Sequence, residues 1–210
     1  MGGLVLACGD ATDALPTGDL RVTELPERPG RTDVDPVLEP SLIVAGTDAD
    51  LAAVVLRLLR RELLADTVVG FVPTRADSAV AALWSLPTDP HAALERARGG
   101  VDRPVPLIRN DAGGVLVGSG VLPRVRGRAY CDDTVALHGP SRSVEVHAGE
   151  DGLVVTVTRG RLVRRRTRHT GRAFQIACDP VVPVSDGVPH PRSMTGWTWY
   201  RHTSDLRLVR

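Results

Sequence analysis

Two short acidic turns hold the residues of this chain that are best placed to do chemistry. Each has the form Thr-x-x-Asp and follows an apolar stretch: Thr47 to Asp50 follows residues 42–46, and Thr74 to Asp77 follows residues 68–73. Free backbone amides at such a helix start can bind a phosphate group. The Thr hydroxyl and the carboxylate three residues later can instead cap the helix and satisfy those amides. The residue types favour capping, and phosphate contact stays open as the functional alternative.

The densest charge in the chain is a run of arginines: Arg159, Arg161, Arg164, Arg165, Arg166, Arg168 and Arg172. On a strand this run places cations on both faces, which a buried strand does not tolerate. It therefore predicts an exposed hairpin at a sheet edge, where charge prevents pairing with other chains. Contact of Arg164, Arg165 and Arg166 with anionic lipid headgroups is the functional alternative. Nucleic acid is not an expected partner, because the net charge is only +1 and no aromatic residues are interleaved with the arginines.

Composition limits the possible chemistry further. All 26 basic residues are arginine, which excludes a Walker-type phosphate-loop lysine and any Schiff-base mechanism. Residues 1–100 carry 15 acidic residues and 9 arginines, whereas residues 101–210 carry 10 acidic residues and 17 arginines. The first half of the sequence therefore has a net charge of −6 and the second half a net charge of +7. This division indicates either two domains that attract each other or a basic face for an anionic ligand or surface.

The remaining composition is that of a soluble globular protein. No apolar run approaches the roughly 20 residues of a membrane-spanning helix. Cys8, Cys131 and Cys178 lack metal-ligand spacing and are expected to be buried thiols, and the six histidines show no close metal-ligand spacing either. We expect a cytoplasmic protein, with peripheral contact to the membrane as an extension of the lipid alternative.

The elements that position the acidic turns follow from the hydrophobic periodicity of the first half. Strands are expected near residues 3–8, 20–25, 42–45 and 67–72, with helices over 48–64, 77–84 and 91–98 and a proline-rich loop over 26–40. Tandem strand-turn-helix units predict a small parallel sheet, at whose carboxyl edge α/β proteins bind ligands. Residues 1–100 therefore form a predicted α/β domain.

After Gly100 the apolar pattern has a period of two. It predicts strands over residues 115–117, 124–130, 144–147, 153–158, 161–166, 173–177 and 197–201. Residues 101–210 are thus expected to form an antiparallel β-sandwich domain. Trp197 and Trp199 alternate along the last of these strands, which predicts that both indoles pack on one face.

The order of these segments resembles the diacylglycerol kinase catalytic-domain family, which includes lipid and sphingosine kinases and is distantly related to NAD kinases. The resemblance covers about residues 41–210. Residues 45–50 stand at the place of the family's Gly-Gly-Asp-Gly-Thr loop, and residues 73–79 stand at its Pro-x-Gly-Thr-x-Asn-Asp-Phe-Ala loop. The late Asp-Gly-Glu signature of the family becomes Asp186-Gly187-Val188. All three motifs keep their positions in the order of segments, but each has lost some of the family's glycine or acidic residues.

The resemblance implies an α/β domain for nucleotide binding, followed by a β-rich domain for substrate binding. It assigns nucleotide contacts to Gly46, Thr47, Asp48, Thr74 and Asp77. It further assigns a metal contact to Asp48, the catalytic carboxylate to Asp186, and ATP and Mg²⁺ as cofactors. Read from the residues alone, Asp186-Gly187 is an ordinary type I′ hairpin turn.

The expected function is ATP-dependent phosphorylation of a lipid or lipid-like alcohol by a divergent lipid kinase, with activity weak or lost. The alternative is a catalytically silent pseudokinase that binds a ligand or partner. Expected partners are the lipid or small-molecule alcohol and an anionic membrane surface, and a homodimer stays open.

Overall fold

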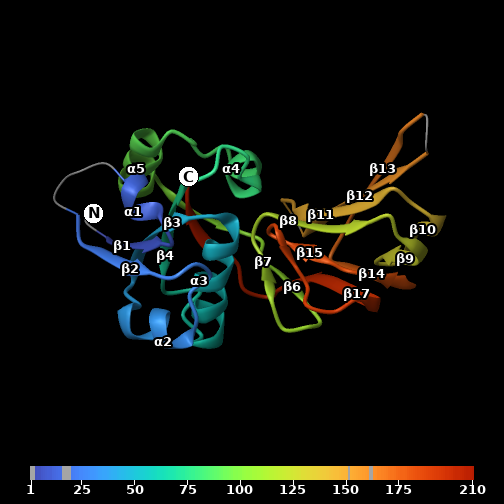
Figure 1. The fold of residues 1–210 in the computed structure, drawn as a ribbon, viewed down its shortest axis with the longest axis horizontal. Helices are drawn as coiled ribbons and strands as arrows, with labels where there is room; N and C mark the ends of the chain where they lie inside the picture. The colour runs from blue at the N-terminus through green and yellow to red at the C-terminus, as the bar shows by residue number, and fades with distance from the viewer. Residues whose placement is uncertain (1–2, 16–19, 151, 161–162) are drawn as a thin grey trace. The chain divides into compact units, whose positions relative to one another are not determined.

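The computed structural model describes residues 3–15, 20–150, 152–160 and 163–210 (Figure 1). The chain divides into two compact units: unit 1 consists of the residues up to Val105 together with Ser204–Arg210, and unit 2 of Pro106–Thr203. The sequence pattern changes near residue 100, whereas the division in space falls after Val105 and returns the last strand to unit 1.

Unit 1 is built on a six-stranded sheet with the order β2-β1-β3-β4-β18-β5. Its strands are β1 (Leu4–Cys8), β2 (Val22–Leu25), β3 (Ser41–Gly46), β4 (Val68–Pro73), β5 (Asp102–Val105) and β18 (Leu206–Val209). All neighbours pair in parallel except β5, which is antiparallel to β18. This sheet confirms the predicted α/β half, and it places the ends of β3 and β4 side by side.

The main helices of unit 1 are α3 (Asp48–Arg60), α4 (Ala79–Trp84) and α5 (Pro90–Gly99). Helix α3 turns one apolar face inward, with Leu51, Val54, Val55 and Leu58 buried. It ends at Arg60 and not at Leu64 as predicted, because Glu62 adopts a left-handed conformation with φ 60°. The N–H of Leu63 then bonds to the carbonyl of Leu58 at 2.9 Å, which closes the helix as a Schellman motif.

Shorter helical turns occupy the segments between the first strands. Helix α1 (Ala11–Ala14) follows β1, and the predicted loop over residues 26–40 contains α2 (Arg31–Val34) and the 3-10 turn η1 (Asp35–Val37). None of the helices formed by the described residues is long and apolar enough to cross a membrane.

Unit 2 consists of two six-stranded antiparallel sheets, with the orders β10-β9-β14-β17-β6-β7 and β13-β12-β11-β8-β15-β16. The strands are β6 (Ile108–Asn110), β7 (Val115–Leu116), β8 (Ser119–Pro123), β9 (Arg126–Cys131), β10 (Thr134–Pro140), β11 (Ser143–Ala148), β12 (Leu153–Arg159), β13 (Arg165–Gly171), β14 (Ala173–Val181), β15 (Val184–Ser185), β16 (Val188–Pro189) and β17 (Met194–Arg201). The strand predicted over residues 161–166 begins only at Arg165, and Arg161 and Leu162 lie outside the described residues.

The core of unit 2 lies between its two sheets. Gly120 of β8 approaches Trp199 of β17 so closely that a Cβ atom there would lie 2.6 Å from the indole ring. Trp197 and Trp199 are both buried, with ring centroids 5.8 Å apart at an interplanar angle of 73°. The predicted packing of this tryptophan pair on one strand face is confirmed, and with it the antiparallel β half.

Candidate functional site

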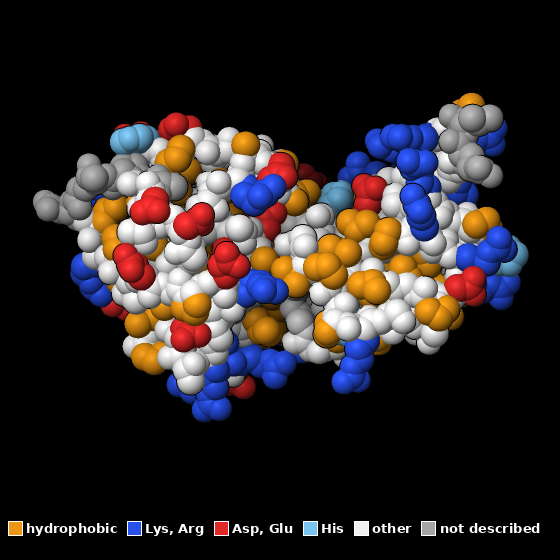
Figure 2. All heavy atoms as spheres, viewed as in Figure 1, with side chains coloured by type: hydrophobic (Ala, Val, Ile, Leu, Met, Phe, Trp, Pro, Cys, Tyr) orange, Lys and Arg blue, Asp and Glu red, His pale blue; other side chains and the backbone are white. Residues whose placement is uncertain are grey.

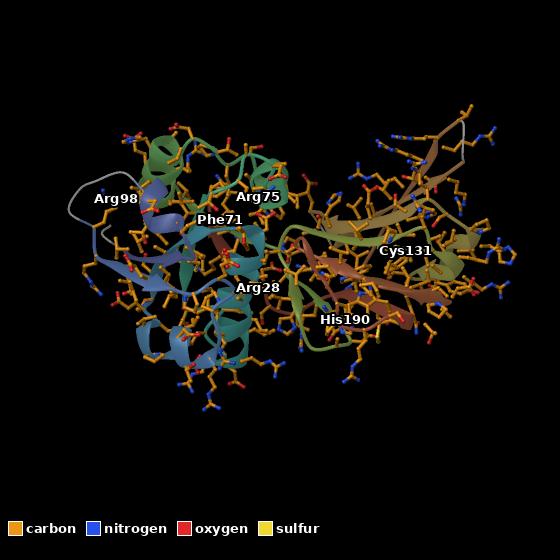
Figure 3. All side chains as sticks on the ribbon, viewed as in Figure 1. Arg28, Phe71, Arg75, Arg98, Cys131 and His190 are labelled. Atoms are coloured by element: carbon orange, nitrogen blue, oxygen red, sulfur yellow. The ribbon has the colours of Figure 1, made fainter. Side chains whose placement is uncertain are left out.

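The turn between β3 and α3 is a helix cap in the structure. Thr47 is the N-cap: its hydroxyl accepts from the N–H of Asp50 at 3.3 Å, and the carboxylate of Asp50 accepts from the N–H of Thr47 at 2.8 Å. Asp50 also accepts from the N–H of Arg28, labelled in Figure 3, at 2.6 Å. The predicted capping box at Thr47 is confirmed, and Asp50 is almost wholly buried by these contacts.

The cap leaves no room for a side chain at position 46. A Cβ atom at Gly46 would lie 2.8 Å from Oδ2 and 2.9 Å from Cβ of Asp50. Only glycine therefore fits beside the capping carboxylate. Close approach of a phosphate group is not needed to explain a glycine at this position.

The turn between β4 and α4 is different, and the predicted cap at Thr74 is wrong. Helix α4 begins four residues later than a cap at Thr74 requires, and its N-cap is Ser78, whose hydroxyl accepts from the N–H of Ala81 at 3.0 Å. Asp77 instead forms a two-pronged ion pair with Arg75, which is labelled in Figure 3, with N–O distances of 2.9 and 3.0 Å. The hydrogen bonds from the guanidinium of Arg75 lower the pKa of Asp77. The N–H of Thr74 bonds to the carbonyl of Gly46 at 3.0 Å, which holds the two turns together.

Asp48 explains why α4 starts where it does. One carboxylate oxygen accepts from the hydroxyl of Ser78, and the other accepts from the N–H groups of Ala79 at 2.7 Å and Val80 at 3.3 Å. A side chain of α3 therefore occupies the positive end of α4, the position at which a helix start would otherwise hold an anion. Both oxygens of Asp48 are engaged within unit 1.

Ser78 is the residue at these two turns that the sequence analysis missed. A serine directly before the apolar run from Ala79 to Leu83 is itself an N-cap signature and could have been found. Its pairing with Asp48 could not, because the two residues are far apart in the sequence.

Asp186 lies in unit 2, in the two-residue turn that joins β15 to β16. Asp186 and Gly187 have φ values of 49° and 81°, the left-handed pair of a type I′ turn. The carboxylate accepts from three consecutive backbone N–H groups, those of Val117 at 3.1 Å, Gly118 at 2.7 Å and Ser119 at 3.1 Å. The turn interpretation is confirmed, and the side chain anchors the segment between β7 and β8.

The hydrogen bonds that Asp48 and Asp186 accept determine whether these residues could bind the implied ATP and Mg²⁺. Mg²⁺ takes oxygen ligands in octahedral geometry, so a protein site has to offer carboxylate lone pairs that backbone donors do not already occupy. Within the residues that the structure describes, no group of three or more His, Cys, Asp or Glu side chains is arranged to hold a metal ion. Asp48 and Asp186 each already accept three hydrogen bonds, which occupy most of the roughly four lone-pair sites of a carboxylate. As they stand, these carboxylates do not fit a magnesium site, and the two capped helix starts do not fit a phosphate group.

The cysteines show no sign of reactivity. Cys8 and Cys131 are buried, and Cys178 is half-buried. Burial, with a smaller contribution from the Asp50 carboxylate, raises the pKa of the Cys8 thiol to about 12. Because the thiolate is the nucleophilic form, Cys8 is a structural thiol, as the sequence analysis predicted.

Comparison with known proteins defines the class of fold. No protein-family model and no curated protein matches the sequence. The crystal structure of a diacylglycerol kinase from Bacillus anthracis str. Sterne aligns over 99% of this chain and 96% of its own, with a TM-score of 0.71 at 11% identity. A second structure from that organism aligns over 99% and 96%, with a TM-score of 0.75 at 10% identity. An NAD kinase from Archaeoglobus fulgidus in complex with ATP aligns over 99% and 93%, with a TM-score of 0.60 at 9% identity.

These alignments show the fold. The chain has the two-part architecture of the diacylglycerol kinase fold, which the NAD kinase shares, and the resemblance drawn from the sequence motifs is confirmed at this level. At identities near 10%, the likeness concerns the fold alone.

Proposed function

We propose that this protein uses the lipid-kinase fold to bind a lipid or lipid-like alcohol, and that ATP-dependent phosphorylation of that alcohol is weak or lost. The observation that carries this proposal is the likeness to a diacylglycerol kinase over 99% of the chain. The turns at Gly46 and Thr74 also lie at the carboxyl ends of adjacent parallel strands, where α/β proteins bind ligands. A cytoplasmic location belongs to the same proposal.

Weak or absent turnover follows from the chemistry of the site. Phosphoryl transfer depends on a cradle for the phosphates and on preorganised charge at the transferred group. Here the amides at the start of α4 bind Asp48, and the amides at residues 117–119 bind Asp186. Nucleotide binding at the β3 and β4 turns would require Asp48 to release α4, which opposes binding.

The same hydrogen bonds favour a second candidate function, a catalytically silent protein that binds a ligand or partner. In that case Asp48 and Asp186 only stabilise the fold and take no part in catalysis. The two candidates differ in one measurable property, namely whether ATP binds and is consumed.

Calorimetric titration of the full chain with ATP in the presence of Mg²⁺ tests binding, and transfer from radiolabelled ATP to mixed bacterial lipids tests turnover. NAD is included as an acceptor because an NAD kinase shares the fold. We expect weak or absent ATP binding, and transfer close to the background without enzyme. Asp186→Asn and Asp48→Asn are compared with Asp179→Asn, which replaces an exposed carboxylate of unit 2.

Slow lipid labelling that disappears in Asp186→Asn and persists in Asp179→Asn supports the weak kinase, provided that circular dichroism shows Asp186→Asn to be folded at the assay temperature. No ATP binding and no labelling of any acceptor supports the silent candidate. Rapid labelling that survives Asp186→Asn contradicts both the site assignment and the proposed loss of activity. Labelling of NAD and of no lipid contradicts the lipid substrate class.

A further inference from the structure

The β12–β13 hairpin is the most strongly charged feature of unit 2. Among the described strands, β13 pairs with β12 alone and forms an edge of its sheet. Figure 1 shows the hairpin extending beyond the neighbouring strands. Figure 2 shows Arg side chains gathered over it. The exposed arginines are Arg164, Arg165, Arg166, Arg168 and Arg172.

The strand register distributes these cations over both faces of the hairpin. Arg166 lies opposite Thr158 and Arg168 opposite Thr156, so these two arginines share one face. Arg165 lies opposite Arg159 on the other face. Like charges directly opposite each other destabilise a sheet, so the Arg159 and Arg165 pair is an arrangement that folding alone does not favour.

The hairpin arginines also lack the partners that arginines of unit 1 have. In unit 1, Arg57, Arg75 and Arg207 form ion pairs with Asp35, Asp77 and Asp102, respectively. Among the residues that the structure describes, no carboxylate pairs with Arg164, Arg165, Arg166 or Arg168. Their charge is therefore available to an external anion.

An apolar side chain lies beside these cations. Val163 is 74% exposed and directly precedes Arg164. An apolar residue next to a run of arginines suits the boundary between lipid headgroups and acyl chains, where apolar burial and attraction to anionic lipids act together. A single strand of nucleic acid would be expected to stack on aromatic side chains, and residues 153–172 contain no Phe, Tyr or Trp.

We propose that the β12–β13 hairpin is a docking surface for membranes that contain anionic lipids, with Arg164, Arg165, Arg166 and Arg168 at the headgroups and Val163 at the interface. The docking concerns unit 2 alone and does not depend on phosphotransfer, so it goes beyond the proposed function. It supplies a reason for the strongly basic half of a chain whose total charge is only +1.

Sedimentation of the full chain with vesicles tests this surface. Vesicles of phosphatidylcholine are compared with vesicles that also contain phosphatidylglycerol, at low and at high salt. We expect binding only to the anionic vesicles and loss of binding at high salt. Replacing Arg164, Arg165 and Arg166 together by Gln should weaken binding about fivefold per arginine, or on the order of 100-fold in all. Replacing the same three residues by Lys should retain most of the binding, because the attraction depends on charge.

The matched control replaces the exposed Arg61, Arg96 and Arg98 of unit 1 by Gln, which changes the net charge by the same amount. We expect the control to bind like the wild type, and Val163→Ser to bind several-fold more weakly with an unchanged salt dependence. Circular dichroism checks that each variant is folded.

The proposal is overturned if the wild type ignores anionic vesicles at low salt, or if the control loses binding as completely as the hairpin variant. Tighter binding to a single-stranded oligonucleotide than to vesicles, persisting at higher salt, would assign the arginines to nucleic acid. Aggregation of the Gln variant, with no vesicle binding by the wild type, would assign them to protection of the sheet edge.

Discussion

At the scale of single residues, the best-placed acids of this chain act as acceptors for its own backbone. Asp48, Asp50 and Asp186 each accept N–H groups from another segment. Hydrogen bonds to a carboxylate are roughly twice as strong as bonds between neutral groups. Each aspartate therefore fixes the end of a helix or strand, and a ligand at the same place has to compete with these bonds.

The caps provide the first prediction. Thr47→Ala and Ser78→Ala should each lower the free energy of unfolding by about 1 kcal/mol, because each removes an N-cap acceptor. Thr74→Ala is the matched control and should change it by only a few tenths, since Thr74 caps no helix. Urea denaturation measures all three. A loss at Thr74 as large as that at Ser78 would contradict the assignment of the α4 cap.

The Asp186 turn provides the second prediction. Asp186→Asn should lower the free energy of unfolding by about 1–3 kcal/mol, because an amide NH₂ group then faces a buried N–H donor. Thermal or denaturant unfolding measures the effect, with Asp179→Asn as the exposed control. Unchanged stability in Asp186→Asn would contradict the structural role assigned to the three N–H bonds.

At the scale of elements, an ion pair joins η1 to α3. The guanidinium of Arg57 in α3 bonds to both carboxylate oxygens of Asp35 in η1, at 2.7 and 2.9 Å. The hydrogen bond from Arg57 lowers the pKa of Asp35, and burial partly opposes that change. The contact fixes the segment before β3 against the helix that follows it.

The third prediction concerns the pH dependence of the stabilisation by the Arg57–Asp35 ion pair. Because the pKa of Asp35 is lower in the folded than in the unfolded chain, its contribution is complete above the unfolded value of about 4 and is lost as the pH falls through the folded value. The stability difference between wild type and Arg57→Gln should therefore be constant near neutral pH and should shrink below about pH 4. Denaturant unfolding over this pH range measures it. A difference that stays constant into the acid range would contradict the assignment.

At the scale of the whole molecule, the last strand returns the C-terminal residues to the sheet of unit 1. Strand β18 lies between β4 and β5 in the sheet of unit 1, parallel to the first and antiparallel to the second. Leu206, Leu208 and Val209 are buried there. The last strand of unit 1 follows all of unit 2 in the sequence, so neither half of the sequence contains the whole core of unit 1.

The fourth prediction concerns this strand. Deleting residues 204–210 should abolish cooperative unfolding of unit 1, because β4 and β5 lose the strand that joins them. Leu208→Ala is the milder test and should cost about 2–5 kcal/mol, the usual range for a fully buried leucine. Calorimetry follows both variants. A truncated chain that unfolds like the wild type would contradict the central place of β18.

The sequence by itself determined the local features of this protein. The capping box at Thr47, the amphipathic face of α3, the period-two strands and the exposed arginine hairpin depend on residues within a few positions of each other. The order of these segments also predicted the diacylglycerol kinase fold. A fold depends more on the order of its helices and strands than on the identity of single residues.

Only the tertiary structure decided what the acidic residues do. Asp48 meets Ser78, Asp186 meets the amides of residues 117–119, and β18 inserts beside β4 from the far end of the chain. The cap expected at Thr74 failed for the same reason, since Asp48 and Ser78 fix the start of α4. Each of these contacts joins residues separated by many positions, and nothing in the local pattern of the sequence specifies which distant donors a carboxylate will meet once the sheets have formed.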